Sequence, residues 1–373
     1  MREQHLHLLA LALIRGLGPV TIKNLVATCG SAESVFESAV SLLRRTPGVG
    51  DATIRAIRRS DTLARAEAEL RFAQRAGVQV FSYLDEAYPQ VLKYIHDAPL
   101  FLFQKGQLDV NAQPNVAIVG TRRASPYGKE IAQYCAKKLA NAGVNVVSGL
   151  AYGIDIAAHK AVLEVNGKTT AVLAHGLDTI YPPTHAAKAN AMLEEGALLT
   201  EYLTGSDPDA MHFPARNRII AGMSQAVIVI EASDKGGALI TADFALQQNR
   251  EVYAVPGKIG DALSIGCLKL IRDHKAKLMT DPQEVIDDLA LQWDIHDKGA
   301  DGEQLSLDIP IPEGPFTDEE AKVLNILQKG RADIDQLTIQ SRLALSRLHP
   351  LLLSMEFKGL IRQLPGKQFE RKR

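Results

Sequence analysis

The most regular pattern along the chain is a series of short apolar runs, each followed by a longer stretch with helical spacing. Residues 226–230 contain only Ala, Val and Ile, which is typical of a strand buried on both faces. Helical stretches at 127–142 and 238–246 follow two of these runs. The alternation predicts an α/β domain, a parallel sheet wrapped by helices, over residues 106–288. The other runs expected to form strands are 116–119, 145–148, 169–174, 197–201, 251–255 and 276–279.

Residues 1–105 have a different pattern and predict a helical domain of the helix-hairpin-helix or SAM-like kind. Two punctuations, GLGP at 16–19 and PGVG at 47–50, have the form glycine–hydrophobic–glycine before a helix. Helix-hairpin-helix modules use that form to direct backbone amides at a DNA phosphate. Glycine caps in an ordinary helical bundle give the same pattern, so both interpretations stay open. The expected helices are 5–14, 22–28, 31–37, 38–44, 51–57 and 61–77, and a strand is expected at 79–83.

Beyond the α/β domain the pattern changes twice. In residues 289–315 Asp, Gly and Pro become frequent and periodicity is lost, which predicts a linker. Residues 316–373 then predict three helices and a strand that turns back, the order of a winged-helix domain. The basic end, with Lys367 and Arg371–373, favours DNA, whereas a third helix with few charges favours a protein partner. The expected elements are helices at 317–328, 333–338 and 344–355 and a strand at 357–364.

The amino-acid composition argues against several classes of protein but does not identify the function. The 42 Lys and Arg residues are balanced by 43 Asp and Glu, so the protein is not a uniformly basic scaffold, although one cleft can still be positive. Cys29, Cys135 and Cys267 are far apart and suit neither a disulfide framework nor a metal site. No stretch approaches the roughly 18–20 apolar residues of a membrane helix. We therefore expect a cytoplasmic protein with no membrane segment.

Glycine-bearing loops follow several of the expected strands. Because ligands of open α/β sheets bind outside the carboxyl ends of the strands, these loops should share one rim. A glycine pair between a strand and a helix lets backbone N–H groups approach a phosphate. The loops are Gly120-Thr121-Arg122-Arg123, Ser148-Gly149 and Gly236-Gly237.

Arginines and one aromatic residue accompany these loops. Guanidinium groups suit phosphate oxygens, and we expect Arg122 and Arg218 to be the phosphate ligands. Phe213 precedes Arg216 by three residues, and an aromatic beside arginines is the composition that stacks single-stranded bases. A core position for Phe213, and a tight turn beside a basic surface helix, are the alternatives. The other polar residues expected in this site are Arg123 and Asn217.

Catalytic and metal sites find little support in the sequence. Neither GxGxxG nor GxxxxGK[ST] occurs at the loops, which argues against a dinucleotide enzyme or a P-loop NTPase. Asp155 and His159 are four residues apart on an expected helix, where a salt-bridged face is favoured over a metal site without a third ligand. His175 and His185 have no GxSxG-type nucleophile beside them. We therefore expect no catalytic residue, no metal and no cofactor.

Six motifs in this order resemble the bacterial DNA-processing protein A (Smf) family. The resemblance implies an extended Rossmann-like domain that binds single-stranded DNA without sequence preference. It also implies a homodimer that loads the RecA recombinase onto that strand during natural transformation. The motifs are VGTRRASPYG at 119–128, SGLAYGIDIAAH at 148–159, GLDTIYP at 176–182, FPARNRIIAG at 213–222, GGALITADFAL at 236–246 and VPGKIGDALSIGC at 255–267.

The family's functional residues fall on matching positions of this sequence. Its glycine-Ser/Thr-arginine signature matches Gly120, Thr121 and Arg122. Its Phe-Pro and arginine motif matches Phe213, Arg216, Asn217 and Arg218, and its glycine loop matches Gly236 and Gly237. Some relatives carry a basic residue just before the Phe-Pro, where this chain has residues 209–212, Asp-Ala-Met-His. One charge contact of the family is therefore in doubt here.

A nucleotide enzyme is the rival hypothesis. Nucleoside-monophosphate phosphoribohydrolases resembling lysine decarboxylase build their site on a PGGxGT loop. Residues 235–241, KGGALIT, come close but lack the preceding proline and the second glycine-threonine step. The primary hypothesis is a non-enzymatic protein whose rim loops converge into a cationic trough. It requires Arg122, Arg218 and the Gly236 turn to lie together.

Overall fold

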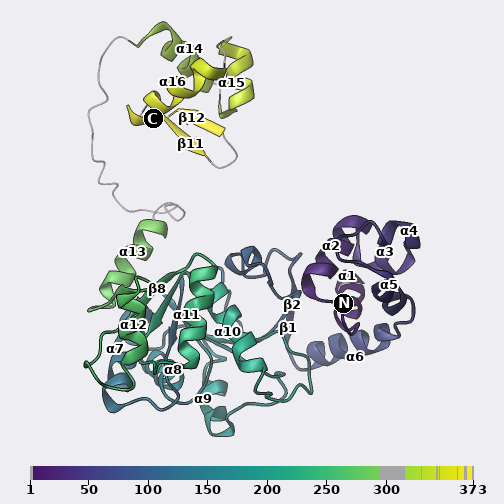
Figure 1. Ribbon diagram of the computed structural model, residues 1–373, viewed down its shortest axis with the longest axis vertical. Coiled ribbons are helices and arrows are strands. Elements are labelled where there is room, and N and C mark those ends of the chain that lie inside the picture. Colours follow the sequence, from purple (N-terminus) through teal and green to yellow (C-terminus); the bar gives the residue numbers. More distant parts are fainter. Residues whose placement is uncertain are drawn as a thin grey trace. The chain divides into compact units, whose positions relative to one another are not determined.

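The computed structural model describes residues 3–293 and 316–371, except for residues 329, 342, 344, 359 and 365–367. These two stretches form two compact units (Figure 1). Most of the expected linker, together with Lys367, Lys372 and Arg373, lies outside the described residues. Residues 289–293, which the sequence analysis assigned to the linker, belong to a helix of the first unit, and Leu289 is buried in its core.

Nine strands form one sheet within residues 3–293, in the order β1-β2-β6-β5-β4-β3-β7-β8-β9. The seven strands from β6 to β9 are parallel, whereas β2 pairs antiparallel with both β6 and β1. The expected parallel α/β sheet is therefore confirmed. The strands are β1 (Gln79–Ser82), β2 (Phe101–Lys105), β3 (Asn115–Val119), β4 (Asn145–Ser148), β5 (Thr169–Val172), β6 (Ala197–Thr200), β7 (Ala226–Val229), β8 (Glu251–Ala254) and β9 (Lys277–Leu278).

Helices cover both faces of this sheet, which explains the uninterrupted apolar runs (Figure 1). On β7, Val227 and Val229 pack on one face and Ala226 and Ile228 on the other, because successive side chains of a strand alternate. The first face is covered by α10 (His212–Gly222), α11 (Gly237–Gln247) and α12 (Ile265–Arg272). The opposite face is covered by α7 (Pro126–Asn141), α8 (Ile154–Glu164) and α13 (Gln283–Trp293).

The order of the strands reverses beside β3. The chain runs from β3 through β4 and β5 to β6, then returns to place β7 on the free side of β3. Val119 and Val229 pair in register at the carboxyl ends of β3 and β7. Loops that leave adjacent strands at such a reversal separate toward opposite faces, and ligands bind in the crevice between them.

The N-terminal helices form an apolar core of their own and also pack on β2. Leu8, Leu11, Ile22 and Leu25 are buried in this core, which continues onto Phe101 and Phe103 of β2. The boundary expected at residue 105 falls at the end of β2, so the sheet extends into the N-terminal segment. The helices are α1 (Glu3–Ala12), α2 (Pro19–Cys29), α3 (Ala32–Glu37), α4 (Val40–Leu43), α5 (Asp51–Arg58) and α6 (Thr62–Arg75).

The second unit has the expected winged-helix order of three helices and a wing. Its core includes Val323, Leu337, Leu348 and Leu352. A capping box begins the first helix, because the Thr317 side chain accepts from the Glu320 amide and the Glu320 carboxylate accepts from the Thr317 amide. The elements are α14 (Asp318–Leu327), β10 (Ala332–Asp333), α15 (Ile334–Ser341), α16 (Leu345–Phe357), β11 (Ile361–Leu364) and β12 (Gln368–Arg371).

Candidate nucleic-acid interface

The loops that follow β3 and β7 are tied together at the rim of the sheet. The Thr121 amide donates to the Glu231 carbonyl oxygen at 2.8 Å. The buried Glu231 carboxylate accepts from the Ser125 amide at 3.0 Å and from the Ser125 hydroxyl at 2.5 Å. Gly128 packs directly on that carboxylate, where a Cβ atom would overlap it. These contacts fix the loop that carries Arg122 and Arg123.

A cleft of about 520 Å³ opens beside these loops, between the strand ends and the helices α10 and α11. Asp155, Tyr181 and Ala210 also line this cleft, although they were not among the residues expected there. Ala210 lies in the segment before Phe213 where one charge contact was in doubt, and its side chain carries no charge. The residues expected in the site that line the cleft are Gly120, Thr121, Arg122, Phe213, Arg216, Asn217, Gly236 and Gly237.

Arg122 and Arg123 present unpaired charges. Both side chains are exposed, and neither has an ion-pair partner within the part of the chain that the structure describes. The Arg122 guanidinium carbon lies 4.9 Å from the centre of the Phe213 ring, within the range of a cation–π contact. Arg122 is therefore held at the cleft with its positive charge available to an anion.

Arg216 forms part of the floor of the cleft and is only 4 % exposed. Its Nη1 atom donates to the carbonyl oxygens of Gly149, at 2.9 Å, and of Val172. Its Nε atom donates to the Asn217 side chain at 3.1 Å. Burial lowers the pKa of Arg216 to about 10, partly offset by the nearby Asp155. Arg216 thus adds positive charge at the floor of the cleft. Its Nε and Nη1 atoms already donate to protein oxygens.

Arg218 lies outside the cleft, so the expected convergence with Arg122 is wrong for this residue. Its Nη2 atom pairs with Glu201 at 2.5 Å and its Nε atom with Asp97 at 3.1 Å. The physical reason is helical geometry, because residues two apart point about 200° away from each other around a helix. Since Arg216 faces the cleft, Arg218 faces the β6 side of α10. The convergence holds for Arg122 and the Gly236–Gly237 turn.

Ser148 and Gly149 lie beneath the rim and do not line the cleft. The Ser148 hydroxyl donates to the Ile118 carbonyl oxygen at 2.6 Å and is fully buried. Gly149 leaves room for the Arg216 guanidinium, since a Cβ atom there would lie 2.5 Å from Nη2. Both residues support the floor of the cleft.

The Gly236–Gly237 turn brings the start of α11 to the cleft. Gly236 has an extended conformation and supplies no side-chain cap, so the first amides of α11 are not covered by a side chain. The Asn217 side-chain amide donates to the Gly237 carbonyl oxygen at 3.5 Å and links α10 to this turn. Open amides at the positive end of a helix dipole favour an anion.

Asp155 and His159 do not form the expected salt-bridged face, because both are buried and have other partners. Asp155 accepts from the amides of Gly149, at 3.1 Å, and Ala151, at 3.4 Å, and burial raises its pKa. The His159 Nδ1 atom contacts the Thr169 hydroxyl at 2.7 Å, and burial lowers the pKa of this histidine to about 3. Among the described residues no cluster of His, Cys, Asp or Glu is arranged to hold a metal.

His175 and His185 pack against loop backbone. The Nδ1 atom of His175 lies 2.8 Å from the Gly176 carbonyl oxygen. That of His185 lies 2.8 Å from the Leu150 carbonyl oxygen. These contacts explain both buried imidazoles without a catalytic role.

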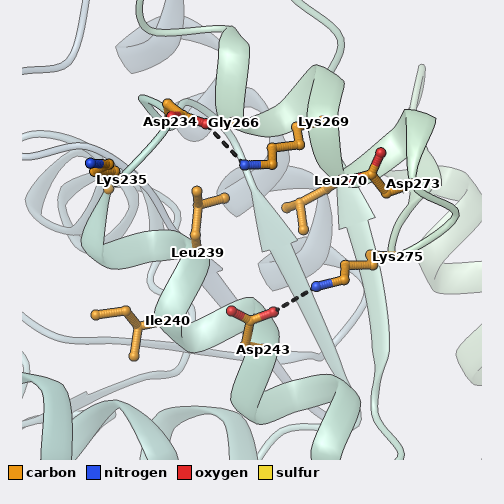
Figure 2. Close-up of a pocket in the computed structure, with 11 residues that line it drawn as sticks. Asp234, Lys235, Leu239, Ile240, Asp243, Gly266, Lys269, Leu270, Asp273 and Lys275 are labelled. Atoms are coloured by element: carbon orange, nitrogen blue, oxygen red, sulfur yellow. Dashed lines mark hydrogen bonds and ion pairs between the residues drawn. The ribbon is translucent and has the colours of Figure 1, made fainter.

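A second groove, of about 340 Å³, runs between α11 and α12 (Figure 2). Figure 2 shows that its charges are mixed: Lys269 pairs with Asp234 at 3.0 Å and Lys275 pairs with Asp243 at 3.3 Å. A polyanion would have to displace these carboxylates. The cleft beside Arg122 is therefore the better anion site of the two.

No helix in the two described stretches is both long enough and apolar enough to cross a membrane.

Comparison with known proteins gives consistent matches along the chain. Residues 79–290 match the family model for DNA recombination-mediator protein A, and residues 310–367 match that of the DprA winged helix domain. The Smf protein of Synechocystis sp. is 33% identical over 391 residues, which cover 98% of each chain. The DNA processing protein DprA of Streptococcus pneumoniae is 47% identical over 206 residues, 55% of this chain and 72% of its own.

The solved structures that resemble this one include two DprA proteins. The crystal structure of DprA from Streptococcus pneumoniae has a TM-score of 0.67 and 36% identity, covering 77% of this chain and 99% of its own. DprA from Helicobacter pylori, solved to explain its single-stranded DNA binding mode, has a TM-score of 0.52 and 27% identity. That match covers 58% of this chain and 96% of the other.

Proposed function

Because the chain belongs to the DNA processing protein A (DprA, Smf) family, we propose that it binds single-stranded DNA without sequence preference and delivers that strand to a RecA-type recombinase. The description of its family as a recombination mediator supports the second step. The DNA binding of the Helicobacter pylori relative supports the first.

The observation that carries this proposal is the unpaired Arg122 guanidinium beside Phe213 in an open cleft. A guanidinium binds phosphate oxygens through two N–H groups, and the start of α11 adds backbone donors on the facing side. Aromatic rings stack on bases of any identity, but only where the base faces are not covered by duplex neighbours. Phosphate contacts and an aromatic ring together therefore suit an unpaired strand, and neither contact depends on the base sequence.

The strand would be held chiefly through phosphates, so its affinity should fall steeply with salt. We expect Arg122→Ala to weaken binding of thymidine and adenosine oligonucleotides to the same extent. We also expect it to reduce the slope of log K against log salt by about 0.7 for the lost phosphate contact. Fluorescence anisotropy at several salt concentrations measures both quantities.

Arg272→Ala is the matched control, because this exposed arginine lies on α12 outside the cleft and pairs with its neighbour Asp273. Its affinity and salt slope should equal those of the wild type. Unchanged affinity in Arg122→Ala would overturn the proposed site.

We further propose a cytoplasmic, non-enzymatic homodimer acting in natural transformation. Light scattering on the purified full chain tests the dimer. The rate at which RecA filaments form on a single strand, with and without the protein, tests delivery. If the added protein did not change the rate of filament formation, the proposed delivery to RecA would be wrong.

The rival is a phosphoribohydrolase, and one observation favours it: the Asp155 carboxylate lines the cleft. That carboxylate already accepts two backbone amides beside Arg216, which explains it as a structural support. Release of free base from nucleoside monophosphates by purified protein, lost in Asp155→Asn, would favour the enzyme.

A further inference from the structure

The two aromatic rings of the cleft are not equally open to a ligand. Phe213 is half-buried, and the Arg122 guanidinium lies over its ring at 4.9 Å. Tyr181 is 42 % exposed and lines the same cleft. In the free protein, the more accessible aromatic surface is therefore that of Tyr181.

The geometry of the ring pair excludes a base between the two rings. Their centres lie 5.9 Å apart and their planes are tilted by 57°. A base inserted between two rings needs them parallel and about 7 Å apart, twice the carbon–carbon contact distance of about 3.5 Å. A base in this cleft must then stack on an outer ring face, and Arg122 already occupies one at Phe213.

The backbone of Tyr181 is anchored by a buried histidine. The Nδ1 atom of His175 faces the Gly176 carbonyl oxygen at 2.8 Å, and because that oxygen only accepts, Nδ1 carries the proton. The Nε2 atom is then free to accept from the Tyr181 amide at 3.3 Å. Burial lowers the pKa of His175, so the neutral form that accepts this bond persists at neutral pH. Tyr181 is thus positioned before any ligand arrives.

We propose that Tyr181 is the base-stacking residue of this cleft and that Phe213 instead holds Arg122 over its ring, ready for a phosphate. This inference rests on the proposed binding of single-stranded DNA and adds the residue that contacts the base. It separates the two parts of a nucleotide: the phosphate goes to Arg122 and the base to Tyr181. Neither contact reads base identity, in keeping with binding that is independent of sequence.

The test compares two probes of equal length and charge: an oligothymidine and an abasic oligonucleotide that keeps the deoxyribose-phosphate backbone. We expect Tyr181→Ala to lose about 5- to 150-fold in affinity for oligothymidine, the range of base–aromatic stacking for one base. Its affinity for the abasic strand should stay at the wild-type value, which also shows that the variant is folded. Tyr181→Phe keeps the ring and should bind both probes like the wild type.

Tyr134→Ala is the matched control, because Tyr134 is 43 % exposed but lies on α7, outside the cleft. It should leave both affinities unchanged. Photo-cross-linking with an oligonucleotide that carries 5-iododeoxyuridine gives an independent readout, and we expect the linked peptide to contain residue 181.

Wild-type affinity of Tyr181→Ala for oligothymidine would overturn the inference and leave the proposed function intact. An equal loss for both probes would also overturn it, since Tyr181 would then act on the backbone or on the fold. If the wild-type protein bound neither probe, the proposed function itself would fail.

Discussion

At the scale of single residues, the arginines of α10 and of the loop after β3 differ in their surroundings. Arg122 is exposed and unpaired among the described residues, Arg216 is buried under the cleft, and Arg218 is paired with two carboxylates. Their residue type is the same, so the sequence could identify a cationic segment but not assign the roles. Packing decides the roles, because burial forces a guanidinium to find oxygen partners inside the protein.

Arg218 should be a stability residue. We expect Arg218→Met to lower the free energy of unfolding by about 3 kcal/mol, because it leaves the largely buried Glu201 carboxylate without its partner. Urea denaturation measures the loss. Affinity for oligothymidine in the folded variant should match the wild type. Weaker DNA binding with unchanged stability would instead restore the role that the sequence analysis expected.

His159 should make the protein less stable in mild acid. Its pKa is about 3 in the folded protein and about 6.5 when unfolded, so between these values only the unfolded chain takes up the proton. Stability therefore falls as pH drops through this window, by about 2 kcal/mol from this residue between about pH 7.5 and about pH 5.

The variant His159→Asn tests this. The Thr169 hydroxyl donates to the Val146 carbonyl oxygen and therefore accepts from Nδ1, and an asparagine amide nitrogen can replace that donor. Its unfolding free energy, measured in urea at both pH values, should fall by about 2 kcal/mol less than that of the wild type. Equal losses in the two proteins would show that His159 does not titrate on unfolding.

At the scale of elements, the sequence predicted the strands well and the faces of α10 poorly. β7 is apolar on every residue and β3 is apolar from Val116 to Val119, and burial on both faces is the arrangement that this pattern favours. The segment that forms α10 places apolar and basic residues side by side, so its hydrophobic face is not evident. Contacts of Ile219 and Ile220 with the sheet orient the helix, and those depend on the whole fold.

The glycine turn before α11 offers a direct element-scale test. A Cβ atom added at Gly237 would meet no heavy atom within 4 Å, and the residue is not in the left-handed conformation. The fold therefore does not require glycine there, whereas a phosphate approaching the backbone would. We expect Gly237→Ala to keep the unfolding free energy within about 0.5 kcal/mol of the wild type and to weaken binding of oligothymidine severalfold. Denaturation and anisotropy measure the two effects.

Gly128→Ala is the opposite case, because its Cβ atom would overlap the Glu231 carboxylate. This variant should lose about 1–3 kcal/mol of stability. If Gly237→Ala bound DNA as tightly as the wild type, the turn would not contact a phosphate.

At the scale of the whole molecule, the sequence predicted a helical segment, an α/β sheet and a winged helix in the correct order. It predicted the strand at 79–83, where β1 lies, but it did not predict β2 or show that both strands extend the sheet, because antiparallel pairing with β6 depends on the whole fold. Nor could it place Tyr181 beside Phe213, since these residues come from different loops and meet only through the fold.

Several basic residues of the second unit are already paired with carboxylates. In the described part of the second unit, Arg331 and Arg362 both pair with Glu370, and Lys358 pairs with Glu320. The cleft of the first unit has unpaired Arg122 instead. We therefore expect the single strand to bind the first unit.

Hydrogen–deuterium exchange of the full chain, with and without saturating oligothymidine, tests this assignment most directly. We expect slower exchange in peptides covering residues 119–123, 213–217 and 236–241, and no change in residues 266–275 or in the described part of the second unit. Protection of residues 266–275 or of the winged helix, with the cleft peptides unchanged, would contradict it.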